Sequence, residues 1–313
     1  MAEGRCLVLG GAGFMGSHLV ELLAGEGRPV RVFDLPGAAA KRLAAVRGKI
    51  ELIEGDFQKA REVAAAVEGC EAVFHLIGTT VPSTSNRDPV YDVETNLLAT
   101  LRLLEACVRA KVKQVIFSSS GGTVYGVAER LPIPETHPTE PRTSYGIVKL
   151  AIEKNLELFR HLHGLDCTVL RVGNAYGPRL PVGGEQGAVG AFLKCLKRGQ
   201  PIPLWGEGSA VRDYVYVEDV ARAFRAALGQ RSPHRVFNIG TGRGTSLREL
   251  IALLERVTGR QASLEQRTGR AADVPENVLD AALARQHLGW KPRVSLEEGL
   301  ARTWKWVEAS SEV

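Results

Sequence analysis

Several patterns are missing from these 313 residues, and each absence excludes a class of protein. The chain has only five cysteines, with no C-x-x-C pair and no metal-ligand spacing. We therefore expect reduced core thiols and no metal site. No run approaches the roughly 20 apolar residues that a membrane span needs, so we expect no membrane segment. Glu3 and Arg5 interrupt any apolar start, so we expect no signal peptide and a cytoplasmic protein.

The chain also has little excess of positive over negative charge. The formal net charge is +5, and the lysines and arginines are scattered rather than gathered into a stripe. This excludes a nucleic-acid surface but suits an anionic substrate. The chain has no internal repeat, coiled coil or low-complexity tract. Its 44% hydrophobic and 24% charged residues are ordinary globular values, and its length allows a main domain with a smaller lobe.

The chain is organised around a glycine-rich turn near its start. Gly10, Gly13 and Gly16 lie between an apolar run at 6–9 and an apolar-periodic segment that begins at Leu19. That order predicts a strand, a turn and a helix. The first glycine permits the tight turn, the second lets a pyrophosphate approach the backbone, and the third lets the helix pack closely on the sheet. The helix N-terminus then favours phosphate charge.

A second predicted strand, at 30–33, ends at Asp34, about 20 residues after the turn. An acidic residue there is expected to hydrogen-bond the adenosine ribose hydroxyls of a dinucleotide. Lys41 and Arg42 would suit the 2′-phosphate of NADP, but Asp34 would repel it, so we predict NAD. The three-and-three glycine spacing resembles the extended branch of the short-chain dehydrogenase/reductase superfamily.

Strands and helices alternate through the first half of the chain. This predicts an α/β fold with a doubly wound, parallel Rossmann sheet. We expect an NAD-binding domain over 1–178 and a smaller α/β substrate lobe over 179–313, with 215–227 and 236–240 packing back on the large domain. The further predicted strands lie at 50–54, 72–76, 115–117 and 168–172.

Polar residues lie in or after several of these strands. Asp56 could accept a hydrogen bond from the adenine amino group, or it could cap the segment that starts at Gln58. Gly78 follows the fourth strand, at the sheet edge where ligands bind. His75, inside that strand, is interpreted as a hydrogen-bonded core residue. Asn96 is a polar candidate on the buried side of a long helix predicted over 89–110.

The residues that could carry chemistry are Tyr145 and Lys149. They are four residues apart in a helix predicted over 144–163, so they share one face. A free tyrosine has a pKa of ~10 and is a poor base at neutral pH, but a nearby ammonium stabilises the phenolate. Lys149 can also reach a nicotinamide ribose. Ser120, after the fifth strand, can orient the same sugar hydroxyl that Tyr145 would deprotonate.

Taken together, these motifs resemble the NAD-dependent nucleotide-sugar epimerase/dehydratase family over nearly the whole chain. The resemblance implies a bound NAD and a UDP-sugar held between the two lobes. The motifs that carry it are the glycine turn, Ser118–Gly126, Tyr145-x-x-x-Lys149, Asn174-x-Tyr176-Gly-Pro-Arg179, Arg212-Asp213-Tyr214 and Leu288-Gly289-Trp290-Lys291-Pro292.

The resemblance also implies roles for individual residues. In the substrate site, Asn174 would hold the nucleotide diphosphate, Arg212 and Arg270 would neutralise its phosphates, and Asp273 would position a ribose or Arg270. Trp205 would pack near the base. Arg179 and Thr80 are further substrate-site candidates, although a solvated surface charge is an equal interpretation for Arg179. The NAD contacts implied besides the residues above are Phe14, Met15, Asp56, Phe57, Leu76, Gly78, Asn96, Ser118 and Val172.

One stretch departs from the family pattern. The pattern has three residues from the catalytic Ser or Thr to the Val of Val-Tyr-Gly, whereas Ser120 lies four before Val124. We take Ser120 as the active-site hydroxyl and keep Thr123 as the alternative. The family's dehydratases carry an Asp-Glu pair beside this Thr. Here the stretch from Ser120 to Thr123 has no carboxylate, which argues against dehydration.

The expected function is therefore 4-epimerisation of a UDP-sugar, such as UDP-glucose to UDP-galactose or an N-acetyl or uronate analogue, through a 4-keto sugar and a bound NAD. The alternatives are an NDP-4-keto-sugar reductase or a UDP-uronate decarboxylase, and a non-catalytic dinucleotide sensor. The helices at 89–110 and 144–163 resemble the pair that forms a four-helix interface in this family, so we expect a homodimer.

Overall fold

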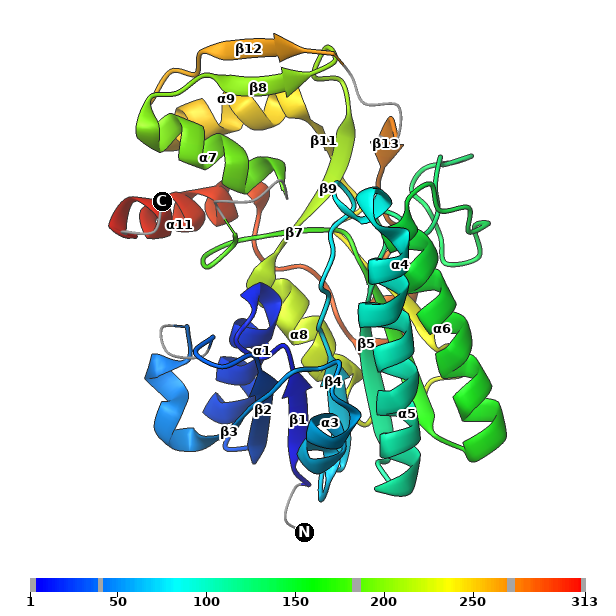
Figure 1. The fold of residues 1–313 in the computed structure, drawn as a ribbon. Helices are drawn as coiled ribbons and strands as arrows, with labels where there is room; N and C mark the ends of the chain where they lie inside the picture. The colour runs from blue at the N-terminus through cyan, green and yellow to red at the C-terminus, as the bar shows by residue number, and fades with distance from the viewer. Residues whose placement is uncertain (1–3, 39–41, 182–186, 269–273, 311–313) are drawn as a thin grey trace.

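A computed structural model of the protein describes residues 4–38, 42–181, 187–268 and 274–310. Its centre is a seven-stranded, all-parallel sheet in the order β10-β6-β5-β4-β1-β2-β3 (Figure 1). The strand order reverses between β1 and β4, which is the switch point where open parallel sheets bind ligands. The strands are β1 (Cys6–Leu9), β2 (Val30–Asp34), β3 (Ile50–Glu54), β4 (Ala72–His75), β5 (Gln114–Ser120), β6 (Asp166–Val172) and β10 (Val236–Ile239).

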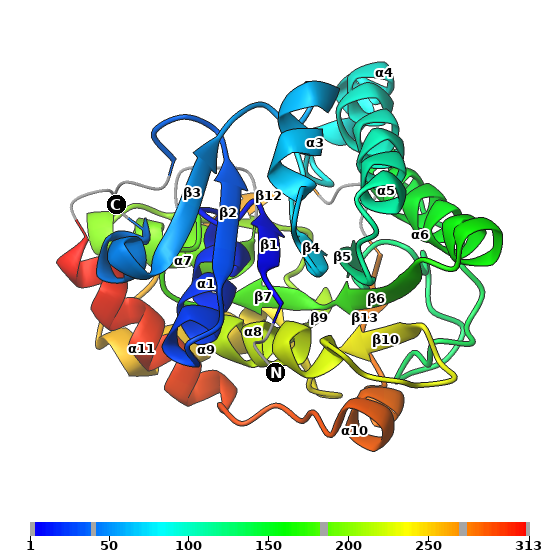
Figure 2. The same cartoon turned by 90° about the horizontal axis from the view of Figure 1, so that it is seen from below.

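Helices cover both faces of this sheet, as Figure 2 shows from below. One face is covered by α1 (Phe14–Gly25), α8 (Val217–Ala227) and α10 (Ala282–Leu288), whose apolar side chains share a core with the sheet. The other face is covered by α3 (Ala60–Val67), α5 (Ala99–Arg109) and α6 (Ser144–His163). Because both faces are buried, the strands are almost continuously apolar rather than alternating. The doubly wound fold expected from the sequence is confirmed.

The helix expected over 89–110 is present, but it contains a π-helical turn. α4 (Pro89–Asp92) runs into η3 (Val93–Leu98), which is π-helical, and then into α5. A π turn adds a residue, so the side chains before it are rotated relative to an ideal α-helix. For this reason Val93, which an unbroken period would bury beside Leu104, is 37% exposed. An apolar face shared by Val93, Leu97, Leu101 and Leu104, which an unbroken helical period predicts, is therefore not buried at this end.

α6 forms where the sequence expects it. The Thr143 side chain accepts a hydrogen bond from the Gly146 backbone N–H and so caps its N-terminus. Gly164 ends it in the left-handed conformation, with φ of +67°. The side chain of Lys149 donates to the Ser118 carbonyl at 2.8 Å, which fixes the helix against the end of β5.

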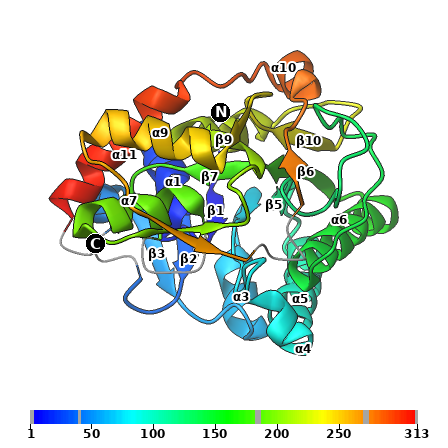
Figure 3. The same ribbon diagram turned by 90° about the horizontal axis from the view of Figure 1, so that it is seen from above.

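The C-terminal part of the chain forms a smaller lobe above the carboxyl ends of the central strands (Figures 1 and 3). Its core is an apolar cluster distinct from the two that flank the sheet. Strand β10 and helix α8 belong to the C-terminal part of the sequence but pack with the large sheet: β10 pairs with β6, and α8 covers one face. The domain boundary at residue 178 stays a prediction. The lobe's remaining elements are β7 (Asn174–Tyr176), α7 (Ala188–Arg198), β8 (Ile202–Trp205), β9 (Val211–Tyr216), β11 (Gly244–Ser246), α9 (Leu247–Thr258), β12 (Leu264–Arg267), β13 (Glu276–Asn277) and α11 (Leu296–Ala309).

Two short helical turns complete the described structure, η1 (Ala44–Lys49) and η2 (Ser85–Arg87). None of the helices in the described ranges is long and apolar enough to cross a membrane.

Candidate active site

The glycine turn lies directly after β1, at the switch point of the sheet. Gly10 has a φ of +77°, a conformation that favours glycine. A side chain at Gly16 would collide with the Gly10 carbonyl oxygen, so the start of α1 can approach the turn only with glycine there. Helix α1 begins after Gly13 and has no side-chain cap. Its first N–H groups therefore face the sheet edge as donors for a phosphate.

Asp34, at the end of β2, contacts this turn. Its two carboxylate oxygens accept one hydrogen bond each, from the backbone N–H groups of Ala12 at 2.8 Å and Leu35 at 2.9 Å. A carboxylate has about four acceptor positions, so, counting bonds from the described part of the chain, two are left for ribose hydroxyls. Arg42 donates to the Ala12 carbonyl at 3.2 Å, and Lys41 lies outside the described residues. The turn and this carboxylate together fit a dinucleotide with an unmodified ribose.

The other predicted NAD contacts follow the same sheet edge. Asp56 accepts a hydrogen bond from the Gln58 backbone N–H at 2.9 Å, so it stabilises a local turn, and Lys59 rather than Asp56 is the N-cap of α3. Phe57 is buried and lies 5.1 Å from the ring of His75. Leu76 is half-buried and Gly78 is exposed, directly after β4.

Three further predicted cofactor contacts are more enclosed. Asn96 is buried, and its side chain accepts from the Thr79 backbone N–H at 3.0 Å and donates to Asp92, so it holds the loop after β4. Ser118 and Val172, on β5 and β6, are buried at neighbouring strand ends. Phe14 and Met15, in the first turn of α1, are half-buried.

His75 behaves as a core residue. Its ring nitrogen Nε2 lies 2.8 Å from the Thr100 hydroxyl, and burial, aided by the charge of Lys149, lowers its pKa to about 3. It is therefore uncharged near neutral pH. The interpretation of His75 as a hydrogen-bonded core group is confirmed.

Tyr145 and Lys149 lie together on α6, with the Lys149 Nζ 5.6 Å from the Tyr145 ring centroid. Removal from water and, to a smaller extent, the charge of Asp92 raise the pKa of Tyr145 to about 12, against the opposing effect of a hydrogen bond with the Ser120 side chain. Burial lowers the pKa of Lys149 to about 8, against the charges of Asp92 and Glu153. Lys149 therefore stays mostly protonated at neutral pH and faces the phenol as a cation.

The two candidate hydroxyls differ in their surroundings. Ser120 ends β5 and hydrogen-bonds Tyr145. The Thr123 hydroxyl is buried and has no partner among the described residues. The backbone N–H groups of Thr123 and Val124 both point to the Ser120 carbonyl, at 3.3 and 3.1 Å, so the extra residue is taken up in a tight turn. The interaction with Tyr145 favours Ser120, and Thr123, whose hydroxyl has no partner in the described ranges, stays the alternative.

On the side of the small lobe, Asn174 of β7 pairs with Tyr214 of β9. The Asn174 side-chain nitrogen and the Tyr214 hydroxyl are buried without a partner in the described part of the chain. Buried polar groups are nearly always hydrogen-bonded, so orphaned ones in a native structure require an explanation, for which a bound ligand is one candidate. Arg212 donates to the Val211 and Pro275 carbonyls, and Trp205, at the end of β8, lies 5.4 Å from the Arg267 guanidinium.

Two further substrate-site candidates have partners within the protein. Arg179 donates to both carboxylate oxygens of Glu21 on α1, at 2.7 Å each, so its charge is already matched within the large layer. The Thr80 hydroxyl donates to Asp92 at 2.6 Å. Arg270 and Asp273 lie outside the described residues.

Two buried side chains near Tyr145 were missed from the sequence. Asn277 of β13 donates to the Gly121 carbonyl at 2.9 Å, which ties the small lobe to the turn after Ser120. Asp92 accepts from the Ser144 hydroxyl at 2.7 Å, next to Tyr145 in the chain. The only sequence signal for Asp92 is its spacing of four residues from Asn96, which places two polar residues on the same side of a helix.

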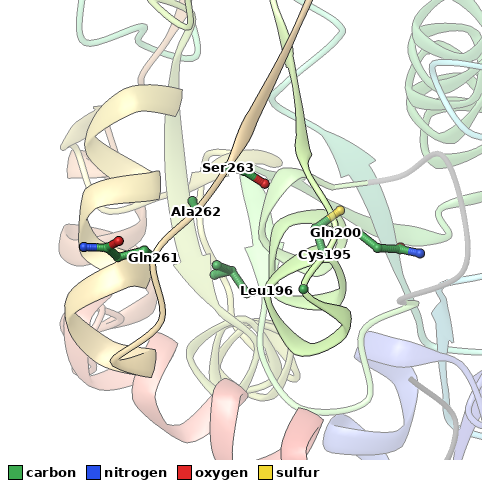
Figure 4. A pocket seen from close by; sticks show the side chains of 7 residues that line it. Cys195, Leu196, Gln200, Gln261, Ala262 and Ser263 are labelled. Carbon is green, nitrogen blue, oxygen red and sulfur yellow. The ribbon is translucent and has the colours of Figure 1, made fainter.

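The small lobe has a hollow of about 230 Å³ of its own, which Figure 4 shows between the end of α7 and the start of β12. The carbonyls there are already bonded, because Cys195 accepts from the Gln200 N–H and Leu196 from Arg260. Burial raises the pKa of the Cys195 thiol. None of the described residues that line this hollow belongs to the site described above.

The comparisons with known proteins agree with this geometry. The family model described as "NAD dependent epimerase/dehydratase family" matches residues 6–240. UDP-glucose 4-epimerase of Mycolicibacterium smegmatis is 37% identical, over 98% of this chain and 100% of that one. The solved UDP-glucose 4-epimerase of Thermotoga maritima, with UDP-glucose, has a TM-score of 0.92 at 40% identity, covering 97% of this chain and 98% of that one. That of Thermus thermophilus, with NAD, has a TM-score of 0.91 at 35% identity, covering 98% and 99%. The chain belongs to the NAD-dependent epimerase/dehydratase family.

Proposed function

We propose that the protein is a UDP-sugar 4-epimerase that interconverts UDP-glucose and UDP-galactose, or the corresponding N-acetyl or uronate sugars. The observation that carries the proposal is the cluster of Tyr145, Lys149 and Ser120 at the carboxyl end of β5, in the same parallel sheet as the glycine turn after β1. The names of the relatives support the same activity.

In the proposed reaction, Tyr145 removes the proton from the sugar 4-hydroxyl, and Ser120 orients that hydroxyl. Lys149 stabilises the phenolate by its charge, because an ammonium nearby favours the ionised form of a tyrosine. Bound NAD supplies a reversible hydride acceptor for the sugar C4. The 4-keto sugar turns in the pocket, C4 would then take the hydride back on its opposite face, and Tyr145 returns the proton to the C4 oxygen, which gives the epimer. The residues proposed to hold the cofactor are Gly10, Gly13, Gly16 and Asp34, with the further contacts along the same edge.

The diphosphate must stay anchored while the sugar turns. Asn174 is proposed for this role because its side-chain nitrogen is buried without a partner among the described residues. Arg212 is proposed to neutralise the phosphates, since charge-assisted bonds from arginine suit phosphate geometry. Arg270, Asp273, Trp205 and Thr80 remain proposals from the family resemblance. Arg179 is not assigned to the diphosphate, because its guanidinium already forms an ion pair with Glu21.

A homodimer is also proposed. Exposed large apolar side chains gather on α4, η3 and α6, and a second copy of the same face would bury them. They are Val90, Tyr91, Val93, Leu98, Ile147, Leu158 and Leu162.

The test is to incubate the purified protein, without added cofactor, with UDP-glucose, UDP-N-acetylglucosamine and UDP-glucuronate in turn, and to separate the products. A galacto product is expected, and the sugar that gives it names the substrate. Turnover only after NAD(P)H and a keto sugar are supplied would instead indicate a reductase, and release of carbon dioxide a decarboxylase.

The role of Tyr145 is tested by replacing it. Tyr145→Phe is expected to lower the rate by at least 100-fold while NAD stays bound, because general-base catalysis contributes about 10²–10⁴-fold. Tyr91→Phe is the matched control, since Tyr91 is 45% exposed on α4. A near-normal rate in the Tyr145 variant would contradict the assignment.

A further inference from the structure

A buried carboxylate lies behind the proposed base. Asp92, the last residue of α4, has no exposed surface. Its side chain accepts hydrogen bonds from the Thr80 hydroxyl at 2.6 Å, the Ser144 hydroxyl at 2.7 Å and the Asn96 amide at 3.0 Å. These donors come from three segments, namely the loop after β4, the start of α6 and the π-helical turn. The carboxylate thus joins the segments that surround Tyr145.

Each of these bonds bears on the position of the base. Ser144 directly precedes Tyr145, and the Tyr145 backbone N–H donates to the Ser85 hydroxyl at 3.1 Å, so the first turn of α6 is held from two sides. Thr80 is a proposed sugar contact, and its bond to Asp92 ties the sugar-facing loop to the same anchor. A displacement of about 1 Å between reacting groups can cost a factor of 10² in rate.

We propose that Asp92 is a positioning residue for catalysis, which fixes the start of α6 against the loop after β4 and applies a fixed negative charge to the Tyr145–Lys149 pair. This inference rests on the proposed role of Tyr145 as the base. It goes beyond that role because it assigns the position of Tyr145, and part of the charge around it, to a residue on another helix.

The direction of the charge effect follows from elementary electrostatics. A nearby anion disfavours the phenolate and favours the ammonium. Accordingly, Asp92 raises the pKa of Tyr145, and it opposes the lowering of the Lys149 pKa by burial. Asp92 therefore keeps Lys149 charged and offsets part of the stabilisation that cations give to the phenolate. A base works best when its pKa lies near the working pH.

The other titratable groups around the pair do not replace Asp92. Glu153, on the next turn of α6, is engaged by Arg171 at 2.6 Å and by Ser119. His75, on β4, is uncharged because burial lowers its pKa. Between the end of β4 and the end of η3, the other charged residues are exposed: Arg87, Asp88 and Glu94. Arg142, just before α6, and Lys154, on α6, are exposed as well.

The first experiment measures Tyr145 itself, without turnover. The phenolate absorbance of the holoenzyme is titrated with pH in the wild type and in Asp92→Asn, each against its Tyr145→Phe partner, so that the difference isolates Tyr145. The midpoint is expected to fall by about one pH unit in Asp92→Asn. Glu94→Gln, which removes an exposed carboxylate two residues away, is expected to leave it unchanged. An unshifted midpoint in folded Asp92→Asn, or an equal shift in both variants, would overturn the proposal.

The second experiment separates charge from position. In Asp92→Asn the rising limb of log(kcat/KM) against pH should move in the same direction as the absorbance midpoint. Ser144→Ala removes one hydrogen bond but keeps the charge, so it should lower kcat and leave that limb in place. If both variants lost activity evenly at all pH values, Asp92 would be structural only. If Asp92→Asn does not fold, Asp92→Ser is measured in its place. An active Tyr145→Phe enzyme would instead refute the proposed base, independently of Asp92.

Discussion

At the scale of single residues, the site depends on a lysine that is close to losing its charge. Lys149 is buried against the Ser118 carbonyl and lies 4.6 Å from the Phe117 ring centroid, where its charge faces the ring. Burial disfavours the ammonium and lowers its pKa to about 8. Since a protonated Lys149 is what stabilises the Tyr145 phenolate, the proposed activity requires the ammonium form of Lys149.

We therefore expect kcat/KM to rise with pH and to level off near pH 8, the pKa of Lys149, because above it each gain in Tyr145 phenolate is offset by an equal loss of the ammonium. Lys149→Arg, whose guanidinium stays charged above pH 12, should have lower activity but should continue to rise above pH 8. The check is a pH profile of each enzyme, with Lys154→Arg, an exposed lysine on the same helix, as control. A plateau that still begins near pH 8 in Lys149→Arg would rule Lys149 out as its source.

The sequence could predict contacts between residues a few positions apart, but not contacts between residues that only the tertiary structure brings together. The spacing of Tyr145 and Lys149 by four predicted their shared helix face, which α6 provides. Asn277 reaches the Gly121 carbonyl from 156 residues away, and no local pattern marks such a contact. The pairing of Arg179 with Glu21 is equally non-local.

At the scale of elements, the π-helical turn shows why a helix period can mislead. Side chains around it bond to backbone carbonyls: Thr95 to Tyr91 at 2.7 Å, Thr100 to Asn96 at 2.6 Å and Asn96 to Asp92 at 3.1 Å. Such bonds compete with the regular backbone ladder and bend helices. The turn also brings the Asn96 side chain to the loop after β4. An apolar period cannot reveal it, because it depends on polar side chains and that loop.

Strand positions were easier to predict than helix faces. The boundaries of β1 and β3 match the expected ranges 6–9 and 50–54. β1 is buried along its whole length and is a continuous apolar run, whereas β3, at the edge of the sheet, alternates apolar residues with Glu51 and Glu54. β5 extends beyond the expected 115–117 because Ser118, Ser119 and Ser120 continue the ladder with β6 despite their polarity. Pairing with a neighbour, rather than composition, decides where that strand ends.

A buried ion pair between α6 and β6 gives a test at this scale. Glu153 and Arg171 are 4% and 7% exposed and 2.6 Å apart. Removing one partner of a buried pair leaves the other charge uncompensated, so Glu153→Gln should lower the free energy of unfolding by roughly 3–5 kcal/mol. Glu157→Gln breaks an exposed pair with Arg160 and should cost about 0–1 kcal/mol. Urea unfolding at neutral pH measures both, and equal losses would contradict the expectation.

At the scale of the whole molecule, the two lobes are joined by buried polar contacts as well as by chain crossings. Asp213 of β9, fully buried, accepts hydrogen bonds from Thr241, Gly242 and Leu279. Its neighbours in the strand are Arg212, which is proposed to neutralise the phosphates, and Tyr214, so fixing Asp213 also fixes the backbone at these two residues. Burial raises its pKa while these bonds oppose the rise. The relation of the small lobe to the sheet edge is thus set by a few specific contacts that sequence alone does not reveal.

The proposed dimer is the last feature that depends on the whole molecule. Seven of the exposed large apolar side chains lie on α4, η3 and α6, which stand together along one side of the sheet (Figure 1). Burying one leucine is worth about 1.5–3 kcal/mol. Two charges introduced at Leu158 and Leu162, which are 47% and 61% exposed, should therefore shift the protein to monomer in sedimentation velocity at micromolar concentration.

Leu264→Glu is the matched control for this prediction, because Leu264 is 46% exposed but lies on β12 of the small lobe. It should leave the sedimentation coefficient unchanged. A wild-type protein that sediments as a monomer, or a Leu158→Glu/Leu162→Glu variant that keeps the wild-type mass, would refute an interface on this face. Because α6 also carries Tyr145, the monomeric variant should further show a lower kcat if the interface stabilises the start of that helix. An unchanged kcat in a true monomer would mean that each subunit holds its base in place alone.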